Sequence, residues 1–392
     1  MKMNITEQSN INSKCTGCFA CSNSCPTKAI TMQLTRDGFY YPVVDKELCI
    51  DCGKCVKVCA VNENFDSHFA PKACYAYSAE DDIRIKSSSG GAFYMLAQYI
   101  LNRHGVVFGA YFNPETMMVE HGSTDDIPLE QIMRSKYVQS RIGNSYKVVK
   151  QELDKDRYVL FCGTPCQIYG LIAYLGRNYS KLFTVDFVCH GVPGTGFFRD
   201  MVKSISEKKD LKVTDVTFRE KDLGWRKQVM KFYFENGTSQ TYVSASYYYY
   251  HYFLHNITLR NSCYTCAFPE NHCSDITMMD YWQIKSDDNK GVSACTVNSD
   301  KGTELFEIVF GPSAENIDFE CIRSGFVTHN KIGVYKRYRG LRDKYMRYYA
   351  NNGFEKAVLK KNKKINTALF AIDSVSKYGG KIKLIIRKFL RR

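Results

Sequence analysis

Two runs of four cysteines near the N-terminus constrain this chain of 392 residues more than any other feature. The first run has the pattern C-x2-C-x2-C-x3-C-P, from Cys15 to Pro26. The second repeats the cysteine spacing from Cys49 to Cys59, but Ala60 stands where the proline would be. Repeated runs of this kind are typical of bacterial ferredoxin modules that hold two 4Fe-4S clusters. The N-terminal segment is therefore predicted to be such a module.

The crossed ligand pattern of these modules assigns each cysteine to a cluster. Three sulfurs of one run bind one cluster, and the fourth is carried to the other cluster. This pattern predicts that cluster one uses Cys15, Cys18, Cys21 and Cys59, and that cluster two uses Cys25, Cys49, Cys52 and Cys55. Zinc knuckles and disulfides are the alternatives, but zinc sites group their cysteines in pairs, so the spacing favours clusters.

Cysteine content and hydropathy indicate the compartment. The chain has 17 cysteines, an odd number, and their spacing argues for a reducing compartment and against a secreted disulfide scaffold. The N-terminal residues before Cys15 have no apolar core and no cleavage site of the kind found in signal peptides. No apolar run approaches the ~20 residues that span a bilayer. We therefore expect a cytoplasmic protein.

The formal net charge of +14 is concentrated at the end of the chain. Residues 331–392 hold 19 Lys or Arg and 3 acidic residues, a balance of +16, so 14 minus 16 leaves −2 for the preceding 330 residues. Within this tail, apolar residues from Ile382 to Leu390 are interleaved with basic ones, which predicts a basic amphipathic helix. Such a helix can lie on the anionic inner face of a membrane or bind an acidic partner. A solvated helix without a target is the alternative.

The hydrophobic pattern predicts a mixed α+β or α/β chain. In the N-terminal module, Ala29–Met32 and Phe39–Val43 are expected to form a β-hairpin around a turn at Asp37-Gly38. Residues 61–72 are expected to be a linker to a larger mixed α/β domain. The tail after this domain is expected to be mostly helical.

A Ser/Gly turn at residues 86–91, with the sequence KSSSGG, precedes an apolar run from Ala92 to Leu101 that predicts a helix. The N-terminus of a helix presents backbone N–H groups and the positive end of its dipole, which suit a phosphate group. A simple N-cap made by the serines is the alternative.

Two buried strands are predicted at residues 157–162 and 181–189, each followed by a turn rich in Gly and Pro. Cys166 and Cys189 lie at or just past the carboxyl ends of these strands, where α/β sheets bind ligands. A lone buried cysteine is usually only a small hydrophobe. Cys162, inside the first strand, keeps that interpretation.

Three later segments carry charge or sulfur. The loop 218–225 is either an exposed turn or places Arg219 and Lys221 over an anionic cofactor. Cys263 and Cys266 form a C-x2-C motif that is compatible with a redox dithiol, half of a zinc site or half of a cluster site. The glycine turn from Lys290 to Ser293 is compatible with phosphate or with a plain loop.

Two other segments are given structural roles. The acidic residues Asp275 and Asp280, followed by Trp282, indicate a loop that crosses a strand end. The tyrosine run 247–252 is expected to be a packed helix rather than a base-stacking platform, so no nucleic-acid partner is expected.

Six segments carry a family resemblance. They are SSSGGAF at 87–93, FCGTPCQIYGL at 161–171, FVCHGVP at 187–193, FREKDLGW at 218–225, CYTCAFPENHCSDITMMDYW at 263–282 and GVSACTVNSDKG at 291–302. In this order, behind a two-cluster ferredoxin module, they resemble the coenzyme F420 hydrogenase/dehydrogenase beta-subunit family. The domains that the resemblance implies are a ferredoxin-type domain at 1–66, the N- and C-terminal regions of the beta subunit at 72–155 and 156–330, and the basic tail at 331–392.

The resemblance implies an iron–sulfur flavoprotein with FAD and a further cluster in the main domain. The FAD-site residues that it implies are Ser88, Ser89, Gly90, Gly91, Arg219, Lys221, Lys290 and Ser293. The implied ligands of the third cluster are Cys166, Cys189, Cys263 and Cys266, with Cys273 in reserve. Coenzyme F420 is a further cofactor candidate. No proton donor is assigned, and His190 is only a guess.

Clusters pass single electrons, whereas a flavin takes a hydride or two single electrons. The sequence thus indicates an oxidoreductase that passes electrons between a ferredoxin-like carrier and a two-electron partner, either a deazaflavin or an organic substrate. A non-catalytic electron-transfer subunit is one alternative. An accessory protein of polysaccharide biosynthesis, docking to an enzyme or membrane, is the other, because the family includes proteins of such gene clusters.

Overall fold

The computed structural model describes residues 4–7, 11–62, 70–227, 229–243, 248–284, 288–327 and 332–358. The amphipathic helix predicted over 382–390 lies outside these ranges. In the described ranges, no helix has both the length and the apolar character needed to cross a membrane.

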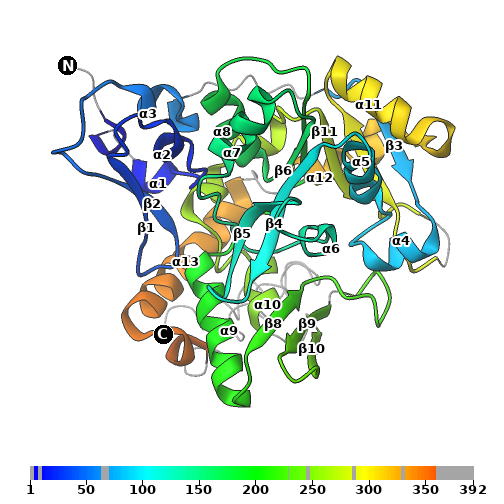
Figure 1. Ribbon diagram of the computed structural model, residues 1–392. Helices are drawn as coiled ribbons and strands as arrows, with labels where there is room; N and C mark the ends of the chain where they lie inside the picture. Colours follow the sequence, from blue (N-terminus) through cyan, green and yellow to red (C-terminus); the bar gives the residue numbers. More distant parts are fainter. Residues whose placement is uncertain are drawn as a thin grey trace.

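The N-terminal module is a small unit beside the main sheet (Figure 1). Its helices are α1 (Ile11–Lys14), α2 (Ala20–Ser24) and α3 (Lys54–Lys57), and its strands are β1 (Ile30–Leu34) and β2 (Tyr40–Val44). The strands pair antiparallel, with Ile30 opposite Val44, so the predicted hairpin is confirmed. Ile5, Ile11 and Ile30 form an apolar cluster with the buried cysteines of the two runs.

The main domain is built on an eight-stranded mixed sheet in the order β13-β3-β12-β11-β7-β6-β4-β5. Its strands are β3 (Ala73–Tyr77), β4 (Val106–Asn113), β5 (Met118–Ser123), β6 (Val159–Cys162), β7 (Leu182–Phe187), β11 (Ile276–Asp280), β12 (Ser293–Val297) and β13 (Glu315–Asn316). The four central strands β4, β6, β7 and β11 are parallel to one another. Their carboxyl ends therefore lie along one edge of the sheet.

Helices cover both faces of this sheet because successive strand residues point to opposite sides. Leu160 packs with α5 (Ala92–Leu101) and α11 (Asp300–Phe310). Its neighbour Phe161 packs with α7 (Ser145–Asp154) and α8 (Pro165–Leu175) on the other face. Phe19 and Tyr40 of the N-terminal module join this second core, so the module packs against the main domain on the α7/α8 side.

A third core lies under the main sheet, around a three-stranded sheet of β8 (Val213–Thr217), β9 (Val229–Phe234) and β10 (Ser239–Val243) (Figure 1). The helices that pack on it are α9 (Thr195–Lys209), α10 (Tyr248–Leu254) and α13 (Ile332–Asn352). Tyr249, Tyr250 and Tyr252 of α10 are buried, which confirms the packed tyrosine helix. Shorter helices are α4 (Asp81–Lys86), α6 (Leu129–Ile132) and α12 (Arg323–Val327).

The prediction of a loop at residues 275–282 is wrong. Ile276–Asp280 is β11, which lies near the middle of the sheet between β7 and β12. The segment resembles a loop because it starts and ends with aspartate. However, the Asp275 carboxylate accepts hydrogen bonds from the backbone N–H and the hydroxyl of Thr184, at 2.8 and 2.9 Å. The Asp275 carboxylate is therefore hydrogen-bonded within the protein at the start of the strand and does not require a solvent-exposed loop.

Candidate functional site

The first hollow in the N-terminal module is lined by Cys15, Cys18, Cys21 and Cys59. Apolar side chains, including those of Ile5, Ile11 and Met32, line the rest of it. The loop between the first two cysteines turns at Gly17, whose φ of 67° is in the left-handed region, and its N–H donates to the Cys15 sulfur at 3.4 Å. The structure thus gathers the set predicted for cluster one from both ends of the module.

The second hollow is lined by Cys25, Cys49, Cys52 and Cys55, the set predicted for cluster two. In the described ranges, no three Cys, His, Asp or Glu side chains converge closely enough to share a single metal ion. The cysteines are instead spread around the walls of each hollow. This arrangement, with soft sulfur donors and apolar walls, suits a multi-iron cluster.

Burial makes three of the thiols predicted to bind cluster one, those of Cys18, Cys21 and Cys59, poor acids. It raises the pKa of Cys18 to about 11 and that of Cys59 to about 12. An apolar environment disfavours the thiolate, whereas bound iron supplies the positive charge that stabilises it. The donor set therefore fits a cationic metal centre, and iron binding should release protons.

A third group of cysteines lies at the carboxyl edge of the main sheet. Cys166 lies in the first turn of α8 just after β6, and Cys189 follows β7. Cys263 lies in the short helix Asn261–Thr265, and Cys266 directly follows it. The Cys189 sulfur accepts a hydrogen bond from the N–H of Gly191 at 3.4 Å. Burial raises the pKa of Cys189, and so does the charge of the nearby Cys263 and Cys166 thiolates. Cys273, the reserve ligand, is exposed.

The first and third groups of cysteines are neighbours. A Cβ atom placed on Gly170 of α8 would lie 3.2 Å from both the Cβ and the sulfur of Cys18. The Thr16 side chain interacts with the sulfurs of both Cys18 and Cys166. The docking of the module on α8 therefore brings Cys18, a predicted ligand of cluster one, next to Cys166 of the third group.

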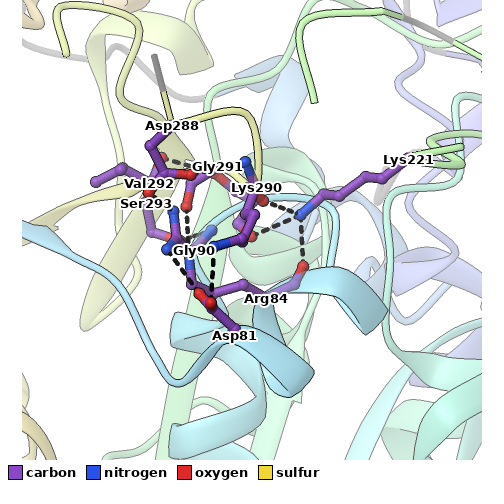
Figure 2. Close-up of polar contacts among 10 residues, drawn as sticks. Asp81, Arg84, Gly90, Lys221, Asp288, Lys290, Gly291, Val292 and Ser293 are labelled. Atoms are coloured by element: carbon purple, nitrogen blue, oxygen red, sulfur yellow. Dashed lines mark hydrogen bonds and ion pairs between the residues drawn. The ribbon is translucent and has the colours of Figure 1, made fainter. Parts of the chain in front are cut away.

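The predicted flavin-site segments converge around the Ser/Gly turn (Figure 2). The Ser89 hydroxyl donates to the Val292 carbonyl at 2.7 Å, and the Gly90 N–H donates to Ser293 Oγ at 3.0 Å. The Lys221 ammonium donates to the carbonyls of Ser89, at 3.0 Å, and of Lys290 and Arg84. Three segments far apart in the sequence thus form one site.

Two features of this site suit an anion. The turn leads into the N-terminus of α5 through Gly91, whose φ is 92°, and the Ser87 hydroxyl beside it is buried with no hydrogen-bond partner among the described residues. The neighbouring Ser88 hydroxyl accepts a hydrogen bond from the Ser135 N–H at 2.7 Å. An unpaired buried hydroxyl that lies beside a helix N-terminus is suited to a phosphate oxygen.

The cations of the site are not equivalent. Ion pairs join Arg84 to Asp81 and Asp288, Lys290 to Asp81, and Arg219 to Asp280. Lys221 instead donates to three backbone carbonyls. Burial and the nearby Arg219 guanidinium lower the pKa of Lys221 from 10.5 to about 7. Among these four side chains, Lys221 therefore has the least compensated charge.

Arg219 lies deeper than the sequence indicated. Its guanidinium donates to Asp280 at 2.8 Å and to the Tyr137 hydroxyl at 3.0 Å, and the residue is 4% exposed. Beside it, Trp282 stacks on the buried Trp225 with ring centroids 4.4 Å apart. Trp282 remains 42% exposed, so a flat aromatic surface lies next to the glycine turn at 290–293.

Sequence reasoning missed Arg84, Gln139 and Arg260. Arg84 donates to the Gly291 carbonyl at 3.0 Å and so holds the glycine turn. Gln139 and Arg260 bind the N-terminal module, and neither lies in a motif that indicates this role.

His190, the residue suggested as a proton donor, packs edge-on against Phe253 with ring centroids 4.8 Å apart.

Two protein families match parts of the chain. Residues 156–311 match the family described as the C terminus of the coenzyme F420 hydrogenase/dehydrogenase beta subunit, and residues 14–62 match a 4Fe-4S dicluster domain. The ferredoxin-type protein NapF of Haemophilus influenzae is 40% identical over 45 residues, 12% of this chain, and the match spans about a quarter (26%) of that relative.

A solved structure also resembles the chain. A chain of the F420-reducing NiFe hydrogenase complex from Methanosarcina barkeri aligns with 77% of this chain and 94% of its own length, at 17% identity and a TM-score of 0.44. The two family matches confirm the resemblance drawn from the motifs. The protein combines an N-terminal 4Fe-4S dicluster domain with a C-terminal domain of the coenzyme F420 hydrogenase/dehydrogenase beta-subunit family.

Proposed function

We propose that the protein is an oxidoreductase that passes electrons between a one-electron carrier and a two-electron donor or acceptor, through three 4Fe-4S clusters and FAD. Clusters exchange single electrons, and a flavin exchanges one or two, so a chain that binds both converts between the two kinds of carrier. A ferredoxin or a similar redox protein is the proposed one-electron partner. A deazaflavin such as coenzyme F420, or an organic substrate, is the proposed two-electron partner.

The observation that carries this proposal is the contact between the dicluster module and the third cysteine group. Cys18 of the module packs against α8, and the first residues of α8 include Cys166. A ferredoxin module that served only as a separate carrier would not need its ligand loop buried against a second set of cysteines. The arrangement supports a continuous path from the module into the main domain.

The FAD proposal rests on the Ser/Gly turn. The Ser87 hydroxyl and the N-terminus of α5 are the groups that would hold a phosphate there, and the charge of Lys221, whose three N–H groups already donate to carbonyls, would attract it. The exposed face of Trp282 offers an apolar surface nearby. These features support binding of an anionic cofactor with a planar ring system.

Anaerobic purification with iron and flavin counting tests the proposal. We expect about 12 irons per chain for three clusters, together with FAD. The variant Cys166→Ser should lose about 4 irons, while Cys321→Ser, a change at an exposed cysteine, should keep the full number. About 8 irons per chain in the unmodified protein would show that it has no third cluster. Absence of flavin would contradict the conversion between one- and two-electron carriers.

Turnover by the isolated chain separates an enzyme from an electron-transfer subunit. The enzyme proposal predicts reduction of a deazaflavin or nicotinamide by the purified chain with a chemical one-electron donor. If activity appears only when a partner protein is added, the chain is an electron-transfer subunit.

A further inference from the structure

A buried cation lies between the N-terminal module and the third cysteine group. Arg260 is fully buried, with 0% of its surface exposed. Its own backbone N–H donates to the Val192 carbonyl at 2.9 Å, and its carbonyl accepts from the Cys263 N–H at 3.0 Å. The residue therefore leads directly into the C-x2-C motif.

The Arg260 side chain binds the module through main-chain groups. Its guanidinium donates to the carbonyls of Cys15, at 2.6 Å, and Tyr40, at 2.8 Å. A third bond goes to the Gln139 side-chain oxygen at 2.9 Å, and the Gln139 amide donates to the Thr16 carbonyl at 2.7 Å. Arg260 and Gln139 thus hold the loop that carries the first ligands of cluster one.

The loop is shaped to fit this pair. Gly17 has a φ of 67°, and a Cβ atom there would lie 2.7 Å from the Gln139 amide nitrogen and 2.8 Å from a guanidinium nitrogen of Arg260. The guanidinium also lies over the Tyr41 ring, 4.5 Å from its centroid. Glycine therefore lets the backbone approach the cation as closely as the hydrogen bonds require.

Arg260 has no carboxylate partner among the described residues. Its side-chain hydrogen bonds go to two backbone carbonyls and one amide. The thiolate forms of Cys15 and Cys263 would supply negative charge to it, whereas the Tyr41 hydroxyl, whose pKa burial raises, is neutral. A buried charge without a counter-charge is costly. The groups placed to balance it are therefore cysteine ligands of the first and third groups.

We propose that Arg260 is the counter-charge of cluster one and of the third cluster, and that it sets their reduction potentials while it positions the module. The proposal rests on the cluster assignments of the proposed function. Addition of one electron to a cluster adds one negative charge, and a nearby cation stabilises the reduced form, so it raises the potential. Cluster two, which takes three of its four ligands from the second run of the module, should not respond.

Redox titration monitored by electron paramagnetic resonance tests this on the intact protein. In Arg260→Met, two clusters should become harder to reduce by at least tenfold in the reduced-to-oxidised ratio at a fixed potential, about 59 mV for one electron. The third signal, from cluster two, should stay unchanged as an internal reference. Arg260→Lys keeps the charge and should shift the ratio by much less.

Gln139→Met is the matched control, because it removes hydrogen bonds to the same loop without removing charge. It should speed amide hydrogen exchange at residues 15–18 but leave the potentials unchanged. Unshifted potentials in Arg260→Met, or an equal shift in Gln139→Met, would overturn the proposal. If Arg260→Met does not fold, Arg260→Gln, which also removes the charge, takes its place, and unshifted potentials in that variant overturn the proposal. Absence of clusters in the unmodified protein would instead refute the proposed function.

Discussion

Lys221 is the residue at which the site should respond to pH. Burial lowers its pKa to about 7, so the ammonium is charged below that pH and largely neutral above it. A bound phosphate favours the charged form and raises the pKa, which means that binding takes up a proton above pH 7. In the free protein the sign is opposite: the lowered pKa costs stability below about pH 7, and stability recovers as the pH rises toward 10.5.

Flavin retention should therefore fall as the pH rises above about 7, by up to tenfold in affinity per pH unit. Lys221→Arg keeps its charge and should remove this dependence, while Lys221→Met should bind weakly at every pH. Flavin fluorescence after gel filtration at pH 6 to 9 measures the effect. A pH-independent profile in the unmodified protein would show that the charge of Lys221 does not act on the bound anion.

Gly90 is the residue of the Ser/Gly turn at which an added side chain should be tolerated least. A Cβ atom there would lie 2.3 Å from the Tyr77 carbonyl oxygen and 2.5 Å from the Ser293 nitrogen. Both are backbone atoms, so the turn must move. Gly90→Ala should lower the free energy of unfolding by about 2 to 3 kcal/mol and release flavin. Gly340→Ala, with nothing within 4 Å of the new methyl group, should be neutral or slightly stabilising in denaturant unfolding.

Residue chemistry could be predicted where local spacing determines it. The two cysteine runs indicated the ligand sets because cluster ligation imposes a fixed interval, and the structure gathers those sets around two hollows. Arg260 could not be predicted, because its role depends on a contact with Cys15, 245 residues away in the sequence. Nothing near Arg260 in the sequence distinguishes it from a surface arginine.

At the scale of elements, α8 is the connector between the two parts. It begins after β6 with a capping box, in which the Thr164 N–H is bound by the Gln167 side chain at 3.0 Å. Its first turn carries Cys166, and Gly170 one turn later meets Cys18. One helix therefore fixes both the third cysteine group and the docked module.

A large side chain at Gly170 should separate the module from the main domain. In Gly170→Leu, the added atoms would collide with Cys18 and with the Tyr146 hydroxyl, which is 3.0 Å from the Cβ position. We expect faster hydrogen exchange in residues 15–25 and slower transfer of electrons from the module to the flavin. Ile172→Leu on the same helix keeps the volume and should change neither. Unchanged exchange in Gly170→Leu would contradict the docking contact.

Element prediction succeeded where apolar periodicity was long and failed where it was short. The run from Ala92 to Leu101 has the bounds of α5. The strands β11 and β12 were missed because polar side chains interrupt their apolar pattern, whereas β1 and β2, which are also five residues long, were predicted. Those side chains are satisfied inside the sheet: Thr277 donates to Asp186 at 2.6 Å. Tertiary contacts, not local propensity, determine the secondary structure of such segments.

At the scale of the whole molecule, the protein is a small cluster module packed against a larger sheet domain. The shared core of Phe19 and Tyr40 with α7 and α8, and the buried Arg260, join the two parts. Electron transfer between them is the property that this arrangement supports. The flavin-site segments lie farther along the carboxyl edge of the sheet, where β11 ends at Asp280 beside Arg219.

An anaerobic reductive titration tests the central claim most directly. A one-electron reductant is added stepwise while visible and paramagnetic spectra record cluster and flavin reduction. We expect uptake of about five electrons per chain, one for each of three clusters and two for the flavin. Uptake of about two electrons, with no flavin reduced, would contradict this claim and leave only a ferredoxin module on an inert domain.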